Sequence, residues 1–149
     1  MSLGLYLHIP YCFSKCRYCD FYSHPGERGV PEAYVDALLR ELDRFAPEAP
    51  LQPDTLYFGG GTPSLLRPEQ AKRLIDAARP MPGAEITLEA NPETVTEESL
   101  AGFREAGVNR ISFGVQSARD TQLRTLGRPH TAKPVSYTHL RAHETRGNL

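Results

Sequence analysis

Short β-prone segments alternate with amphipathic helical segments along most of this chain. The β-prone runs occupy residues 5–9, 55–58, 85–90 and 110–115. Apolar side chains recur at helical spacing at residues 31–45, 68–78 and 96–107, and a last helix is indicated around Leu123 and Leu126. Neighbouring strands joined through helices run parallel, because a parallel pair needs a crossover connection. The pattern therefore predicts an α/β fold of parallel β/α repeats.

Residues at the ends of the predicted helices agree with this pattern. Pro31 suits a first helical turn, and Pro47 prevents that helix from continuing. Thr96 is a suitable N-cap, and Gly107 is a suitable residue just past a helix end. The buried face of the first helix is expected to contain Val35, Leu38, Leu39, Leu42 and Phe45.

Chemically interesting residues follow the ends of successive predicted strands. They are a cysteine loop after the first strand, a glycine run at 59–61, Glu89 and Gln116. Periodicity does not distinguish an open doubly wound sheet from part of a barrel, but both bind ligands at the carboxyl ends of their strands. We therefore expect these residues to converge at one edge of the sheet.

The cysteine loop has the spacing C-x3-C-x2-C, formed by Cys12, Cys16 and Cys19, and the chain has no fourth cysteine. A disulfide framework is disfavoured, because no distant thiol is present to close a long loop. Three thiolates can hold a [4Fe-4S] cluster and leave one iron open. That iron can chelate the amino and carboxylate groups of S-adenosylmethionine (SAM), whose sulfonium bond an electron from the cluster can then break.

Two other interpretations of the thiols stay open on spacing alone. His8 or His24 could complete a structural Cys3His zinc site. The thiols could also be inert or act in redox chemistry. His8 belongs to the first predicted strand, where packing is the commoner role of a histidine, and this weakens the zinc interpretation.

The glycine run and the two polar strand ends each have an ordinary interpretation beside the functional one. A Gly-Gly-Gly run is often only a flexible turn, but here Thr62-Pro63 follows it at a strand end. Glycines permit close backbone approach, and exposed amides can bind the polar groups of an amino acid. The Lys-Ser/Thr of a P-loop is absent. Glu89 and Gln116 are either solvated side chains or contacts to a ligand at this edge.

Composition excludes some partners. The 17 Lys and Arg residues balance 18 Asp and Glu residues, so no basic surface for nucleic acid is predicted. No apolar run approaches the length of a membrane span, and the amino terminus does not have the pattern of a signal peptide. A cytoplasmic location without a transmembrane segment is expected.

Five motifs in order resemble the radical SAM family and, more narrowly, its oxygen-independent coproporphyrinogen III oxidases and their haem-chaperone relatives. The resemblance extends from about residue 5 to 132. The motifs are YLHIPYC at 6–12, the cysteine loop CFSKCRYC at 12–19, YFGGGTPS at 57–64, EANPE at 89–93 and GVNRISFGVQS at 107–117. The segment LGRPHT at 126–131 also matches the family.

The resemblance implies a partial, TIM-like (β/α)6 barrel with a [4Fe-4S] cluster at its mouth, of which this chain holds the first, truncated part. It implies that Cys12, Cys16 and Cys19 are the cluster ligands. At matching positions it implies SAM contacts from Tyr6, Tyr18, Gly60, Gly61, Thr62, Glu89, Gln116 and Arg128.

One position separates two branches of the resembled family. The oxidases have a further cysteine two residues after the third cluster ligand, whereas this chain has Phe21 in CDFYS at 19–23. This difference resembles the haem-chaperone branch, whose members bind haem and deliver it to haemoproteins. The alternative is an oxidase that decarboxylates coproporphyrinogen III. Either activity implies haem or a porphyrin as a ligand and a reducing electron donor as a partner, and the structural zinc module remains the alternative of another class.

The resemblance also divides the chain. Residues 1–132 are expected to be the amino-terminal part of a radical SAM core domain. Residues 133–149 depart from the family pattern and are expected to be an artefactual or disordered tail, so His139 and His143 are assigned no function. Family members continue for roughly two more barrel units, as expected for barrels of about 250 residues.

Overall fold

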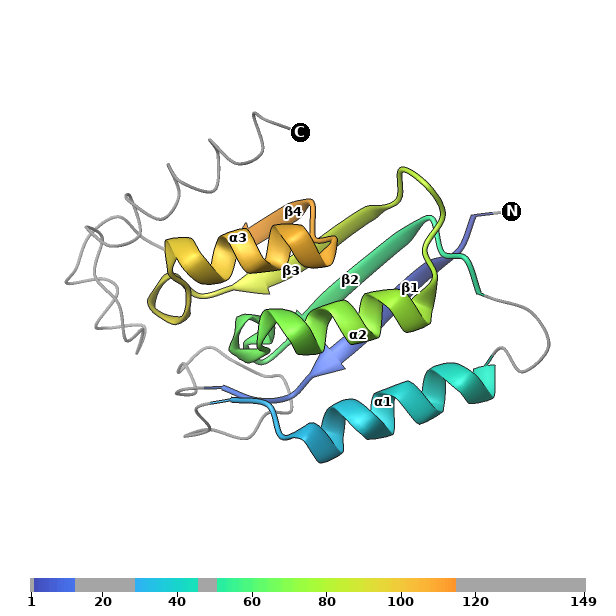
Figure 1. Cartoon of the computed structure of the whole chain (residues 1–149), viewed down its shortest axis with the longest axis horizontal. Helices are drawn as coiled ribbons and strands as arrows, with labels where there is room; N and C mark the ends of the chain where they lie inside the picture. Colours follow the sequence, from blue (N-terminus) through green and yellow to red (C-terminus); the bar gives the residue numbers. More distant parts are fainter. Residues whose placement is uncertain (1, 13–28, 46–50, 115–149) are drawn as a thin grey trace.

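The computed structural model describes residues 2–12, 29–45 and 51–114 of the chain, and these residues form a β/α repeat (Figure 1). Its strands are β1 (Gly4–Ile9), β2 (Thr55–Gly60), β3 (Glu85–Ala90) and β4 (Arg110–Phe113). Its α-helices are α1 (Glu32–Phe45), α2 (Pro68–Ala78) and α3 (Glu97–Ala106). Two short 3-10 turns, η1 (Pro63–Leu65) and η2 (Pro92–Thr94), follow β2 and β3.

All strand pairs in the described sheet are parallel, and the strand order is β1-β2-β3-β4. The α/β prediction is therefore confirmed. A doubly wound sheet reverses its strand order at a switch point. The described strands show no reversal, since each pairs with the strand before it, as successive strands of a barrel do.

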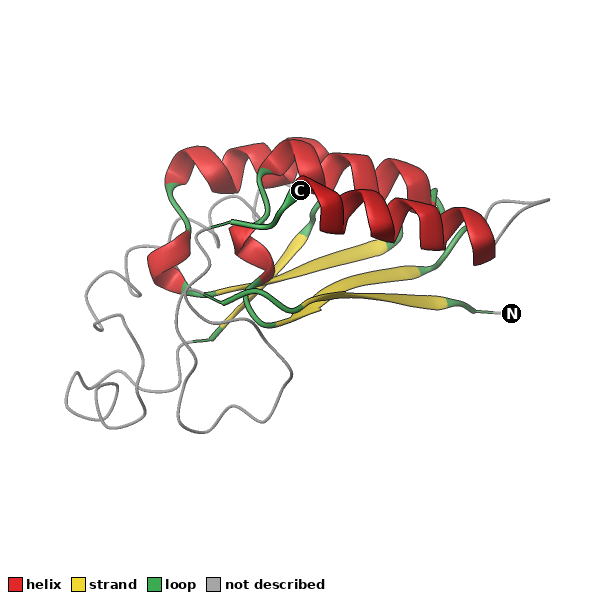
Figure 2. Ribbon diagram, turned by 90° about the horizontal axis from the view of Figure 1, so that it is seen from below, coloured by secondary structure: helices red, strands yellow, loops and turns green. Residues whose placement is uncertain are grey.

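The described helices cover only one face of the sheet, as Figure 2 shows. Strand residues alternate between the two faces. The helix-covered face contributes Leu7, Ile9, Leu56, Phe58, Ile86 and Leu88 to the core. The opposite face, here called the open face, holds Tyr6, His8, Tyr57, Thr87, Glu89 and Ser112, on the alternate positions of their strands.

Helix packing completes the core. Val35 of α1, Leu74 of α2 and Phe103 of α3 are fully buried against the sheet. Burial of each such side chain contributes about 1.5–3 kcal/mol relative to exposure. No helix within the described ranges is long and apolar enough to cross a membrane.

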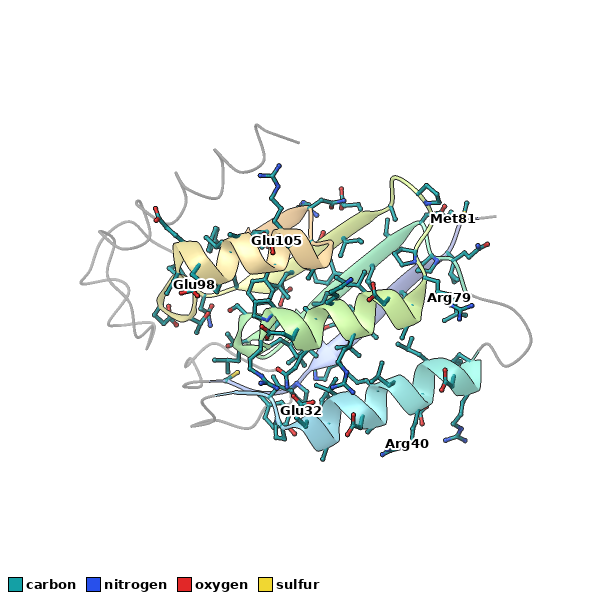
Figure 3. All side chains as sticks on the ribbon, in the orientation of Figure 1. Glu32, Arg40, Arg79, Met81, Glu98 and Glu105 are labelled. Carbon is teal, nitrogen blue, oxygen red and sulfur yellow. The ribbon has the colours of Figure 1, made fainter. Side chains whose placement is uncertain are left out.

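The helices are also joined by polar contacts on their outer side. Figure 3 shows Glu32 at the start of α1, on the side of that helix that faces α2. Its carboxylate accepts hydrogen bonds from Arg67, from Nη1 of Arg73 at 2.8 Å and from Nε2 of Gln70 at 3.0 Å. Gln70 is buried and also donates to the carbonyl of Val30 at 2.9 Å. This network fixes the chain that enters α1 to the first turn of α2.

Thr96 and Gly107 bound α3 as predicted, Pro31 lies just before α1 rather than within its first turn, and Pro47 lies outside the described residues. Three other details differ from the prediction or lie outside the described residues. Phe45 is 73% exposed and does not join the core, because helical spacing does not reveal how far a sheet extends beneath a helix. β4 ends at Phe113 rather than at residue 115, although the amide of Gly114 still donates to the carbonyl of Ala90 at 3.0 Å. The helix expected around Leu123 lies outside the described residues.

Candidate functional site

Aromatic rings lie side by side on the open face. Tyr6 of β1 pairs with Tyr57 of β2 in the register of the sheet, and their rings are stacked with centroids 5.9 Å apart and planes 13° apart. The ring of His8 lies 6.1 Å from that of Tyr6, and its Nδ1 is 3.4 Å from the Tyr6 hydroxyl. Tyr6 is 54% exposed. This face therefore offers flat apolar surface with polar atoms at its edges.

Glu89 extends this group of side chains onto the third strand. The Tyr57 hydroxyl donates a hydrogen bond to Glu89 Oε1 at 2.7 Å. Burial raises the pKa of Tyr57 to about 12, reinforced by the hydrogen bond to Glu89 and by its negative charge, while Ser112 and Arg110 act in the opposite direction. Burial and the charge of Glu89 also raise the pKa of Tyr6. Both phenols therefore keep their protons at neutral pH.

The glycine run allows β2 to approach the chain that leaves β1. Gly60 has a φ of +114°, and a Cβ there would lie 2.7 Å from the His8 ring. A Cβ on Gly61 would lie 2.6 Å from the carbonyl oxygen of Tyr11 and 2.7 Å from Cys12 Sγ. Glycine is required here by close backbone approach, as well as by the positive φ at residue 60.

The backbone amides after β2 are already engaged. The amide of Gly61 donates to the carbonyl of Ile9 at 2.8 Å, and that of Thr62 donates to the carbonyl of Tyr11 at 2.7 Å. The amides of Gly61 and Thr62 are therefore not free to bind the polar groups of a ligand. They continue the pairing of the two strand ends instead, because parallel chains that stay adjacent satisfy their own donors.

Cys12 lies at this junction. It is a free, buried cysteine with 4% exposure, placed just after β1 and directly against Gly61. Cys16, Cys19, Tyr18, Gln116 and Arg128 lie outside the described residues, as does His24, the second histidine of the zinc interpretation. Within the described ranges, no cluster of three potential metal ligands is found.

A hydrogen-bonded clamp joins the carboxyl ends of β2 and β3. Thr62 is 1% exposed, and its Oγ1 accepts a hydrogen bond from Asn91 Nδ2 at 3.0 Å. Thr94 donates to the carbonyl of Asn91 at 2.7 Å, and its hydroxyl is hydrogen bonded to that of Ser64. Neither Asn91 nor Thr94 was predicted from the sequence to have a role in the site, although both fall within or beside the EANPE motif.

Tyr34 anchors α1 to the strand that precedes the cysteines. Its hydroxyl donates to the carbonyl of His8 at 2.6 Å, and its ring meets Tyr11 edge to face at 5.3 Å. The sequence reasoning also missed this residue, because a tyrosine on an amphipathic helix has no distinctive local pattern. The only available signal was the position of Tyr34 in the first turn of α1, because in a β/α repeat this turn lies near the carboxyl end of the preceding strand, β1.

The sequence and the fold identify the class of protein. The sequence matches the radical SAM superfamily over residues 6–148, and the chain belongs to that family. It is 47% identical over 134 residues to heme chaperone HemW of Escherichia coli K12, an alignment that covers 86% of this chain and 35% of the relative. It is 41% identical over 143 residues to the mitochondrial radical S-adenosyl methionine domain-containing protein 1 of Bos taurus, covering 91% and 32%.

The fold resembles that of a solved relative from the same superfamily. Coproporphyrinogen III oxidase (HemN) from Escherichia coli, described as a radical SAM enzyme, matches with a TM-score of 0.86 and 30% identity, over 97% of this chain and 35% of that one. The sheet is thus the partial radical SAM barrel that the sequence predicted. This chain spans about a third of the length of the relatives it matches.

Family membership implies a [4Fe-4S] cluster and SAM as cofactors, and the described residues fit this pair. A buried thiol suits a metal or cluster ligand. Cys12 is buried and packs against Gly61, where any side chain larger than that of glycine would collide with the thiol. The open face next to it presents stacked rings and a carboxylate, groups that can contact a nucleoside and an ammonium group. The family match favours the cluster over the zinc module.

Proposed function

We propose that this chain is part of a radical SAM haem chaperone, which binds haem and delivers it to haemoproteins. The observation that carries the proposal is the buried Cys12 thiol packed on Gly61 at the carboxyl ends of β1 and β2, in a chain 47% identical to heme chaperone HemW. Phe21, in place of the additional cysteine of the oxidases, supports the chaperone branch.

Cys12, Cys16 and Cys19 are the proposed ligands of the cluster. Three thiolates leave one iron of a [4Fe-4S] cluster open for SAM. When bound, the pair supplies one-electron chemistry, with a reducing electron donor as a partner. Gly61 keeps β2 close to Cys12, and Tyr34 holds the chain before the cysteines through the carbonyl of His8.

The proposed SAM site consists of residues near the carboxyl ends of the strands. Because the amides of Gly61 and Thr62 are engaged, we propose that the glycine run contacts the ammonium group of SAM through carbonyl oxygens, which accept hydrogen bonds. The rings on the open face suit its adenine. The complete proposed set is Tyr6, Tyr18, Gly60, Gly61, Thr62, Glu89, Gln116 and Arg128.

Anaerobic reconstitution followed by haem titration tests this proposal. The protein reconstituted with iron and sulfide should be brown, contain about four irons per chain and shift the Soret absorption of added haem. Cys16→Ala should lose the cluster, because two thiolates do not hold it. Absence of haem binding in the reconstituted protein would refute the chaperone assignment, and unchanged iron content in Cys16→Ala would refute the ligand assignment.

A coproporphyrinogen III oxidase is the second candidate, favoured by the structural match to HemN. It would oxidatively decarboxylate two propionate groups of coproporphyrinogen III to vinyl groups, each with loss of CO2, a hydrogen atom and an electron that passes to an electron acceptor. The same reconstituted protein, given SAM, reductant, an electron acceptor and coproporphyrinogen III without oxygen, distinguishes the two functions. Formation of protoporphyrinogen would establish the oxidase, whereas haem transfer to an apo-haemoprotein without turnover would establish the chaperone. Zinc without iron or sulfide in protein purified anaerobically would support the structural module instead.

A further inference from the structure

We propose that Tyr57 is a positioning residue that holds the Glu89 carboxylate in the orientation required to bind SAM. The inference rests on the proposed role of Glu89 as a SAM contact. Tyr57 itself belongs to none of the sets assigned above. It acts through its hydroxyl, which donates to Glu89 Oε1 at 2.7 Å.

The position of Tyr57 in the sheet makes this role specific. β2 lies between β1 and β3, so a side chain on the open face of β2 can contact neighbours on both sides. The Tyr57 ring stacks on Tyr6 across one strand interface, and its hydroxyl bonds to Glu89 across the other. One residue thereby links two proposed SAM contacts on different strands.

A glutamate at this place needs such a partner. Its side chain has several rotatable bonds, and a partly buried carboxylate that keeps some freedom loses rotamer entropy when a ligand fixes it. The rigid phenol fixes one carboxylate oxygen before the ligand arrives. Because burial and Glu89 raise the pKa of Tyr57 to about 12, the donating proton is present throughout the physiological range.

A structural role for the same bond makes a different prediction. If the bond only joined β2 to β3, Tyr57→Phe would lower the free energy of unfolding but would leave the SAM affinity of the folded protein unchanged. If Tyr57 acts through Glu89, its loss weakens binding only while Glu89 is present. A double-mutant cycle separates these two cases.

The cycle comprises the wild type, Tyr57→Phe, Glu89→Ala and the double variant, all reconstituted anaerobically and compared at equal iron content. SAM affinity is measured by equilibrium dialysis. Tyr57→Phe keeps the ring and its stacking on Tyr6 but removes the donor, so about a tenfold loss of affinity is expected for one hydrogen bond to a charged group. Glu89→Ala should lose at least as much, and the double variant should match Glu89→Ala alone.

Tyr34→Phe is the matched control. It also removes one tyrosine hydroxyl that donates to an oxygen, here the carbonyl of His8 at 2.6 Å, but it makes no contact with Glu89. Its effect on SAM affinity is expected to add to that of Glu89→Ala. Replacement of Tyr57 by 4-aminophenylalanine, which restores a donor at the same place, should recover most of the affinity that Tyr57→Phe loses.

The outcomes distinguish this inference from the function on which it rests. If Glu89→Ala binds SAM like the wild type, the proposed role of Glu89 fails, and the inference fails with it. If Glu89→Ala weakens binding but Tyr57→Phe does not, or if the two effects are additive, only the positioning role is overturned. If Tyr57→Phe does not fold, the 4-aminophenylalanine variant decides, because folding with wild-type affinity supports the donor role and folding with tenfold weaker affinity overturns it.

Discussion

Gly61 shows how one residue can connect the fold to the cluster. A Cβ at this position would lie 2.6 Å from the carbonyl oxygen of Tyr11 and 2.7 Å from Cys12 Sγ. Because the first of these neighbours is backbone, Gly61→Ala should displace the chain after β1. We expect a loss of about 1–3 kcal/mol in the free energy of unfolding and a lower iron content after anaerobic reconstitution.

Gly29→Ala is the control for that substitution. It makes the same chemical change where an added Cβ meets nothing within 4 Å. Its stability and iron content should equal those of the wild type, measured by urea denaturation and by iron and sulfide analysis. If Gly61→Ala takes up as much iron as Gly29→Ala, close packing at Cys12 is not required for the cluster.

The raised pKa of Tyr57 predicts a specific pH dependence of stability. The native state holds the Tyr57 proton up to about pH 12, whereas the unfolded chain releases it near the ordinary tyrosine pKa of 10.0. Between these values the native state binds more protons than the unfolded state, so stability falls as the pH rises. The contribution is fully present below pH 10.

Comparison with Tyr57→Phe isolates this effect from that of other tyrosines whose pKa is also raised, such as Tyr34. The stability advantage of the wild type over Tyr57→Phe should be constant from pH 7 to 9 and should shrink above pH 10. Urea denaturation at each pH measures it. A constant difference up to pH 11 would show that the folded-state pKa of Tyr57 is not raised.

Sequence reasoning located part of the site and missed its internal contacts. The strand-end rule placed Cys12, Gly61 and Glu89 correctly at the carboxyl ends of successive strands, because that rule needs only strand boundaries and direction. The bond from Tyr57 to Glu89 depends on sheet register and on which face each side chain occupies. No local sequence pattern determines the register between β2 and β3, which are 30 residues apart in the chain.

At the scale of elements, the helices and strands follow local signals closely. Pro31 precedes α1, Thr96 caps α3 and Gly107 ends it with a φ of +120°. These boundaries were predictable because each depends on the backbone preference of one residue or on hydrogen bonds within one turn. The end of β4 and the exposure of Phe45 were not predictable, since they depend on how far neighbouring elements extend.

The N-terminus of α3 allows a test of one such signal. The Thr96 hydroxyl accepts from the amide of Ser99 at 3.1 Å, and Ser99 Oγ accepts from the amide of Thr96 at 2.9 Å. Thr96→Ala should therefore lower the free energy of unfolding by about 1 kcal/mol. Thr96→Ser keeps the hydroxyl and should retain most of the stability.

The SAM affinity of Thr96→Ala provides the complementary measurement. The described helices, α3 among them, cover one face of the sheet (Figure 2). Tyr6 and Glu89 lie on the opposite face by their positions in the strand register. The reconstituted variant should therefore bind SAM as the wild type does, despite its lower stability. A large loss of affinity would show that the helix side and the open face are coupled through the sheet.

At the scale of the whole molecule, the main feature is the difference between the two faces of the sheet. One face carries the helices and the apolar core, whereas the other displays Tyr6, His8, Tyr57 and Glu89. In a β/α barrel the face without helices lines the interior, and ligands bind at the carboxyl ends of its strands. This explains why Tyr6, in the middle of a strand, is 54% exposed in the described part of the chain.

A ligand that bridges several strands on this face should stabilise the whole fold. Free SAM at a hundred times its Kd should add about 2.7 kcal/mol to the free energy of unfolding, because it binds only the folded state. For a chain of this size, that corresponds to a rise of about 5–10 °C in Tm. The shift in Tm should vanish after the iron is removed by a chelator, and Glu89→Ala should need a higher SAM concentration to reach the same shift.

Adenosine is the control for binding through the base alone. If SAM gives the same rise in Tm with and without iron, SAM binds independently of the cysteine loop, and the proposed link between Cys12 and the open face is wrong.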